Sequence, residues 1–174
     1  MEKINIKNLP EILEKNLPKI IRKIAEKHNV QEYIDNPDFL ERRLLSWHQF
    51  GLLEHTKKIR QVFLGELYDF LNKWEVYEIS YEFLSQKVDD IEKKVLLEIS
   101  MTLHDLGKII CQNDKRVNRN HELASKNLLY DNFLMNLLQN LGLSKTHINS
   151  IGRYIETHDV VGKNLRDILK DSGN

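Results

Sequence analysis

Glycine and proline are scarce in this chain, and cysteine is almost absent. Seven glycines, three prolines and one cysteine occur among its 174 residues. Because chain breakers are few and β-branched residues hardly ever alternate with polar ones, a sheet-rich architecture is excluded. The sequence predicts an all-α fold, a compact helical bundle. The lone cysteine, Cys111, rules out an internal disulfide and is typical of a reducing cytoplasm.

Charge of one sign and long apolar runs are also missing. Lys and Arg together number 26, and so do Asp and Glu. This balance removes the overall basic charge of a dedicated nucleic-acid binder, although a local basic patch remains open. The N-terminus lacks the apolar run of a signal peptide or membrane helix, so we expect a cytoplasmic protein without a membrane partner.

Helical periodicity divides the chain into amphipathic segments. Pro18 should bend or split the first of them. The acidic stretch from Asp89 is typical of a helix N-terminus. The expected helices are 9–28, 36–48, 52–74, one from Asp89 to the pair His104-Asp105, one after Asn120, 133–141, and one after Ser144.

The stretch LLEISMTLHDLGKII, residues 96–110, is the part around which the rest of the chain is expected to be organised. It predicts an apolar helix that ends on His104 and Asp105 next to a loop. Gly107 is expected to end the helix with a positive φ, and Lys108 to complement the helix dipole. A rigid helix end is a good place to present a nitrogen and an oxygen ligand to one metal ion.

Four histidines fall on or at the ends of four different predicted helices. A single such residue is most simply explained as a core histidine with a backbone hydrogen-bond partner. Because each buried polar group left unpaired costs about 1–3 kcal/mol, four of them need a shared reason, and a divalent metal ion supplies one. The ligand set expected from the residues is His55, His104, His121, His158, Asp105 and Asp159.

Basic residues follow the His-Asp pair in the sequence. Lys108 comes three residues after Asp105, and Lys115 and Arg116 lie in the polar stretch beyond Cys111. Two interpretations are open: a solvated loop, or a basic rim that binds an anionic substrate.

The histidine-bearing segments LLEHTKKI, LHDLGK, RNHELASK and IGRYIETHD, in this order, resemble the HD superfamily of metal-dependent phosphohydrolases. The resemblance covers roughly 52–159. It implies an HD-type helical bundle over 51–174, with 1–50 as an N-terminal helical extension packed on the core. It also implies one or two divalent ions (Mn, Mg, Fe, Ni, Co or Zn). His55, His104 and Asp105 match the first three ligand positions, and His121 and His158 match the histidines of members that bind a second metal.

One ligand of the family pattern has no clear counterpart. The final metal-binding aspartate usually lies on a helix well after the position of His158, whereas this sequence offers only Asp159 and Asp167. Either one of them substitutes, or the chain is a fragment of a longer protein, or the site is incomplete.

The resemblance implies hydrolysis of a phosphomonoester or phosphodiester, with a nucleotide as the small phosphorylated substrate. Asp105 would bind metal and orient the attacking water, while Lys108, helped by Lys115 or Arg116, would neutralise phosphate charge. One alternative is a non-catalytic HD module that binds nucleotide or metal and regulates a partner. Another is a helical adaptor whose histidines are ordinary core residues.

Overall fold

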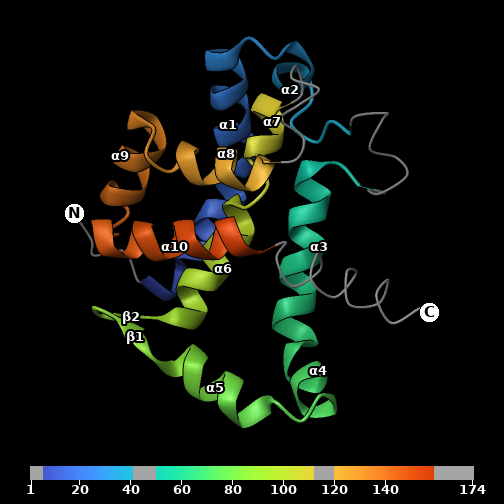
Figure 1. The fold of residues 1–174 in the computed structure, drawn as a ribbon. Helices are drawn as coiled ribbons and strands as arrows, with labels where there is room; N and C mark the ends of the chain where they lie inside the picture. The colour runs from blue at the N-terminus through green and yellow to red at the C-terminus, as the bar shows by residue number, and fades with distance from the viewer. Residues whose placement is uncertain (1–5, 41–49, 112–119, 159–174) are drawn as a thin grey trace.

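The computed structural model describes residues 6–40, 50–111 and 120–158, and this part of the chain is almost entirely helical (Figure 1). The elements are a 3₁₀ turn Ile6–Asn8, α1 Leu9–His28, α2 Gln31–Asp35, α3 Leu52–Gly65, α4 Leu67–Lys73, α5 Tyr77–Ser85, β1 Lys87–Val88, β2 Ile91–Glu92, α6 Lys93–Leu103, α7 Gly107–Cys111, α8 His121–Leu128, α9 Asn132–Asn140 and α10 Lys145–Thr157. The all-α prediction is confirmed. Among the described helices, none combines the length and the apolarity needed to cross a membrane.

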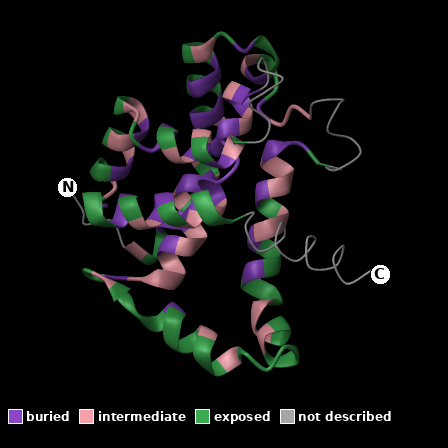
Figure 2. Cartoon of the chain, in the orientation of Figure 1, coloured by how far each residue is buried: buried purple, intermediate pink, exposed green. Residues whose placement is uncertain are grey.

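The core forms where α6 is surrounded by α1, α3 and α10, and where α8 packs on α7 and α10. Figure 2 shows the buried residues concentrated at these contacts, while α4 and α5 are largely exposed. The apolar faces of α1 and α6 belong to one continuous cluster of buried side chains. Burying those faces supplies most of the driving force for the bundle. The end of α6, and with it the His-Asp pair, is therefore set in the middle of the molecule.

Pro18 does not split the first helix, because α1 runs unbroken from Leu9 to His28 as one element. The helix predicted from Asn36 is wrong for its first residues, since 36–40 are not helical; 41–48 lie outside the described residues. Asp38 instead caps α3 across the chain, because its Oδ1 accepts the N–H groups of Leu53 and Glu54 at 2.8 and 3.0 Å.

The long helix predicted over 52–74 is two helices, separated at Glu66 directly after Gly65. Glycine has a low helix propensity, which favours an interruption there. The helix start predicted at Asp89 is also wrong, because α6 begins at Lys93. Asp89 and Asp90 form the turn between β1 and β2, and Asp89 adopts a φ of 52°. Aspartate tolerates this left-handed conformation better than most residues.

His147 contributes to this fold and not to the histidine cluster. Its Nδ1 accepts the Ser144 N–H at 3.1 Å, and its Nε2 lies 2.9 Å from the carbonyl oxygen of Val88. Ser144 Oγ accepts the His147 N–H in return, so the two residues form a reciprocal N-terminal cap on α10. Both ring nitrogens of His147 are therefore engaged in tying α10 to β1.

The apolar stripe of α3, which includes Ile59 and Val62 at helical spacing, is turned partly towards solvent. Val62 is 44% exposed, whereas Arg60 is only 5% exposed. The Arg60 guanidinium forms ion pairs with Glu14 of α1 and with Glu98 of α6, the latter at 2.5 Å. This buried arginine, paired with two acids, joins α3 to both neighbouring helices. A prediction that assumes only apolar residues are buried cannot identify it.

We predict that Arg60→Met lowers the free energy of unfolding by about 2–4 kcal/mol, because it leaves two carboxylates facing a partly buried interface without a cation. Urea unfolding of the variant measures this loss. Arg153→Met on the exposed face of α10 is the matched control and should change stability by less than about 0.5 kcal/mol. Equal stabilities of the two variants would contradict the role assigned to Arg60.

Candidate metal centre

The His-Asp pair lies at the end of α6, where packing on both sides fixes its position. His104 is the C-terminal cap residue of the helix, and Leu103 and Leu106 on either side of the pair are buried. His104 and Asp105 are themselves only 6% and 2% exposed. Two ionisable side chains are thus held in the core by a rigid backbone.

Imidazole nitrogens surround the Asp105 carboxylate, and they come from α3, from the end of α6 and from the start of α8. The Nε2 atoms of His55 and His104 each lie 3.3 Å from Oδ2, and the Nε2 of His121 lies 3.3 Å from Oδ1. His158, at the end of α10, completes the group, because its ring centroid is 4.9 Å from that of His104 and 5.5 Å from that of His121. The structure therefore brings together all four histidines selected from the sequence.

Exposure increases across this group from the core outwards. His104 is buried, the side chains of His55 and His121 are 26% and 16% exposed, and His158 is exposed. The cluster therefore extends from the core, at His104, to the surface, at His158. Within the described part of the chain, the group is most exposed on the side of His158.

Hydrogen bonds fix which ring nitrogen faces the carboxylate. His104 Nδ1 lies 2.7 Å from the carbonyl oxygen of Met101, and His158 Nδ1 lies 2.6 Å from that of Ile155. A carbonyl only accepts, so in both rings Nδ1–H donates. When these rings are neutral, their Nε2 lone pairs are left free, as in metal-binding histidines. Glu122, which is buried, approaches His121 Nδ1 at 3.5 Å and can orient the third ring.

The protonation states suit cation binding. Burial lowers the pKa of His104 from its ordinary value of 6.5, even though the Asp105 carboxylate opposes the shift. Burial alone would raise the pKa of Asp105, yet His104, His121 and Lys108 outweigh it and hold that pKa well below 3.8. At neutral pH the Asp105 carboxylate therefore faces the neutral imidazole of His104. Both groups have lone pairs that a shared cation would bind.

The donor atoms fit one or two divalent ions. They form two groups, His55–His104–Asp105 and Asp105–His121–His158, and in each group the donor atoms lie within 4.8 Å of one another. Ligands bound at ~2.0–2.2 Å to a common ion stand roughly 3–4 Å apart, so both groups need little adjustment. Asp105 belongs to both, and its two oxygens face different histidines. The mixed nitrogen and oxygen donors suit a divalent first-row metal.

Lys108 already pairs with the central carboxylate. Its Nζ lies 2.6 Å from Asp105 Oδ2, and its side chain is 16% exposed. The lysine expected to neutralise substrate phosphate is thus placed at the centre. Asp159, Asp167, Lys115 and Arg116 lie outside the described residues, so their roles as ligands or substrate contacts remain predictions.

Two residues near the centre were not identified from the sequence. Glu122 stands beside His121 in the chain and could have been suspected as its partner. Tyr33 of α2 is buried, and burial, followed by the Asp105 carboxylate, raises its pKa. Its proximity to Asp105 depends on how α2 folds back on α1, which no local sequence pattern predicts.

Gly107 has a different role from the one expected. Its φ is not positive, and it begins α7 instead of ending α6. A Cβ at this position would clash with the carbonyl oxygen of His121 and lie 2.5 Å from the backbone nitrogen of Ser125. The Gly107 N–H also donates to Ser125 Oγ at 2.7 Å. The glycine is therefore needed for the close approach of α7 to α8, which positions His121.

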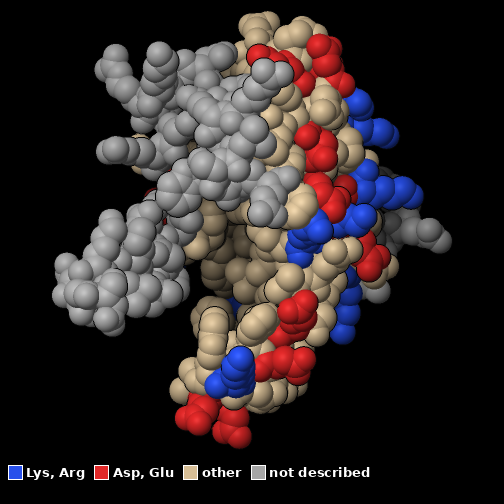
Figure 3. All heavy atoms as spheres, turned by 90° about the vertical axis from the view of Figure 1, so that its right-hand side faces the viewer, with Lys and Arg blue, Asp and Glu red and all other residues tan. Residues whose placement is uncertain are grey.

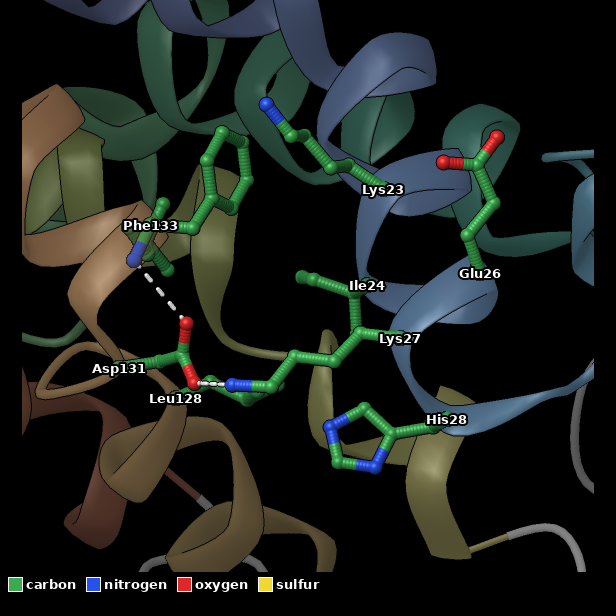
Figure 4. Close-up of a pocket in the computed structure, with 9 residues that line it drawn as sticks. Lys23, Ile24, Glu26, Lys27, His28, Leu128, Asp131 and Phe133 are labelled. Atoms are coloured by element: carbon green, nitrogen blue, oxygen red, sulfur yellow. Dashed lines mark hydrogen bonds and ion pairs between the residues drawn. The ribbon is translucent and has the colours of Figure 1, made fainter.

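A separate pocket of about 270 Å³ lies between α1 and the α8–α9 region (Figure 4). An ion pair between Lys27 and Asp131 spans one side of it. Asp131 also caps α9 by accepting the Phe133 N–H at 3.0 Å, and its hydrogen bond with Lys27 lowers its pKa. These contacts explain the charged residues of this pocket as a tie between α1 and α9.

We predict that Gly107→Ala lowers the free energy of unfolding by roughly 1–3 kcal/mol, because α7 and α8 must separate to admit the methyl group. It should also weaken metal binding, since His121 would move with α8. Gly65→Ala is the control: no atom lies within 4 Å of the added Cβ, and stability should change by less than about 1 kcal/mol. Thermal unfolding with and without Mn²⁺ measures both effects, and wild-type metal binding in Gly107→Ala would contradict this role.

Acidification should destabilise the metal-free protein. Because the pKa of His104 is lower in the folded state, the unfolded chain binds more protons once the pH falls below about 6.5, and the free energy of unfolding then declines. The carboxylate of Asp105 adds to the loss only below its ordinary value of 3.8. Urea unfolding in EDTA between pH 7.5 and 5 should show a smaller decline for His104→Gln than for the wild type. Parallel declines would show that His104 is not held neutral.

Comparisons with known proteins gave no relatives. The chain matches none of the protein-family models, and neither a curated protein nor a solved structure matches it. Function therefore has to be inferred from the side chains that surround Asp105.

Proposed function

We propose that this chain is a metal-dependent phosphohydrolase of the HD type that acts on a phosphomonoester or phosphodiester, with a nucleotide as substrate. The observation that carries the proposal is the group of four histidines around one buried carboxylate, with His104 and His158 oriented by backbone carbonyls. A single histidine in a protein core does not require three further histidines and a carboxylate beside it. The convergence of four helices on Asp105 is explained by a common ligand.

The residues that would hold metal divide into the two groups that share Asp105. A bound divalent ion supplies a Lewis acid for phosphoryl oxygen and lowers the pKa of bound water towards about 7. Asp105 keeps its negative charge at neutral pH, so it can accept a hydrogen bond from water and orient it for attack on phosphorus. The backbone-fixed histidines hold this geometry, and the rigid end of α6 limits its reorganisation.

Lys108 is the described cation best placed to meet substrate charge. Its ammonium group lies next to Asp105 and is not fully buried. A phosphate entering the site would offer this ammonium further oxygen acceptors, and charge stabilisation of this kind is a large part of catalysis in phosphoryl transfer. Lys115 and Arg116, a few residues further along the chain, are proposed to extend the basic rim.

A second candidate function is a non-catalytic HD module that binds nucleotide or metal and regulates a partner. The ion pair between Lys108 and Asp105 favours it, because an internal cation already neutralises the central carboxylate. Among the described residues, moreover, Asp105 is the one carboxylate in either metal-binding group. Such a module would bind metal or nucleotide without turnover.

We predict that His104→Gln and Asp105→Asn each abolish stoichiometric metal binding and reduce phosphatase or phosphodiesterase turnover at least about 100-fold, since even second-shell partners of metal ligands contribute 10–100-fold. Elemental analysis and a substrate panel with added Mn²⁺, Mg²⁺, Ni²⁺ or Co²⁺ measure the two losses. His28→Gln, at the end of α1 and outside the cluster, should retain both.

The same measurements separate the candidates. Metal binding with turnover in the wild type, lost in both variants, supports the hydrolase. Metal or nucleotide binding without turnover of any substrate supports the regulatory module. A wild type that takes up no divalent metal, or an Asp105→Asn variant with full activity, would eliminate the metal-dependent mechanism.

A further inference from the structure

An apolar groove begins one helical turn from the candidate metal centre. It has a volume of about 350 Å³, within the ~300–1,000 Å³ range typical of small-molecule sites. Its apolar lining consists of Ile59, Val62, Phe63, Leu67, Phe70 and Met101. Figure 3 views the side of the molecule on which α3 lies, where the surface is hollowed among side chains that are mostly uncharged.

Both helices that carry the central histidines continue into the groove. On α3, Ile59 and Val62 follow His55 by one and two turns on the same side of the helix, about 6 and 10 Å along its axis. On α6, Met101 belongs to the groove lining, and its carbonyl oxygen accepts the hydrogen bond from His104. The groove and the histidine cluster are therefore built on the same two rigid elements.

The groove explains the outward turn of the α3 stripe. Val62 of α3 is 44% exposed and Phe70 of α4 is 40% exposed, whereas Phe63, which also lines the groove, is 5% exposed. The buried side of α3 carries Arg60, which pairs with acids of α1 and α6, as well as Phe63. Among the described residues, the apolar stripe is thus partly exposed next to the cluster, where a ligand can cover it.

Aromatic rings lie at the far end of the groove. Phe70 belongs to its lining, and its ring centroid lies 6.1 Å from that of Trp74, which is 68% exposed. Lys58 is the one charged residue among the described lining, and it comes three residues after His55. Its Nζ is 3.6 Å from Glu54 and 4.4 Å from the Phe50 ring centroid. The order along α3 and α4 is thus histidine ligand, cation and apolar wall on α3, then aromatic rings on and directly after α4.

We propose that this groove binds the aromatic base of the phosphoester whose phosphate lies at the metal centre. The assignment rests on the proposed function for the position of the phosphate. The wall offers apolar and aromatic surface to the faces of a ring and almost no polar groups to its edges. Base binding by stacking tolerates different bases, because every base has a π face. We therefore expect selection by ring size, purine over pyrimidine, with adenine and guanine alike.

Uncleavable phosphonates test the groove on the full chain in Mn²⁺. The probes are methylphosphonate, which lacks a base, the phosphonate analogues of AMP, GMP and CMP, and octylphosphonate. Calorimetry should give a Kd for the AMP analogue at least about tenfold below that of methylphosphonate, a ratio that burial of one ring face can supply. The GMP analogue should agree with the AMP analogue within about threefold, and the CMP analogue should be weaker.

Val62→Asn and Leu64→Asn form the matched pair of variants. Both replace an exposed apolar residue of α3 with the same neutral amide, and Leu64, 53% exposed, is not part of the groove lining. Val62→Asn should remove most of the gain of the AMP analogue and leave the Kd of methylphosphonate unchanged. Leu64→Asn should alter neither. Thermal unfolding verifies that both variants fold.

Three results would overturn the assignment. The first is an equal Kd for the AMP analogue and methylphosphonate, and the second is a gain in affinity of the AMP analogue that Val62→Asn does not reduce. The third is a Val62-dependent gain in affinity confined to octylphosphonate, which would make the occupant aliphatic. Failure of the proposed function gives a different result. In that case the protein takes up no Mn²⁺ and does not bind methylphosphonate. Val62-dependent binding of adenosine would then still support the groove as a base site, and its absence would overturn it as well.

Discussion

A buried carboxylate facing imidazole nitrogens is the constraint on which this structure depends. Asp105 is almost inaccessible, yet it remains ionised because Lys108 and His121 stabilise its charge. An isolated ion in such a position would be very costly, so the surrounding helices have to bring partners to it. The end of α6, the first turns of α3 and α8 and the residue that caps the C-terminus of α10 are placed accordingly. The bundle is therefore arranged around a charge as much as around an apolar core.

Several contacts far from Asp105 maintain this arrangement. Arg60 joins α3 to α1 and α6 through two acids, Asp38 caps the start of α3, and Gly107 allows α7 to approach α8 closely. Each of them fixes an element that carries a histidine of the cluster. Such supporting contacts decide whether ligand atoms stand at the spacing that a metal ion requires, because a site misplaced by about 1 Å loses much of its affinity.

The orientation of α3 connects the fold to the proposed chemistry. Its buried side includes the ion-paired Arg60 beside Thr56 and Phe63, and its partly exposed apolar side faces a groove that begins next to His55. A helix with this distribution gives up some apolar burial within the monomer. The surface along this helix therefore has a polar end at the histidine cluster and an apolar end beside Phe70, and a ligand can contact both. That polarity matches a molecule with a phosphate at one end and an aromatic ring at the other.

The sequence alone determined the helical class, because few chain breakers and a clear 3.6-residue periodicity leave little choice. It also identified His55, His104, Asp105, His121 and His158, since four histidines at helical positions need a common reason. Tertiary structure decided what periodicity cannot encode. Arg60 can be buried because Glu14 and Glu98 of other helices form ion pairs with it. Position 107 requires glycine because the backbone of α8 packs against it. Asp89 turns a hairpin instead of starting a helix, since β1 and β2 pair before α6 begins. Local sequence patterns indicate which residues are typical of a buried core or of a metal ligand. The partners of those residues lie elsewhere in the chain, and only folding brings them together.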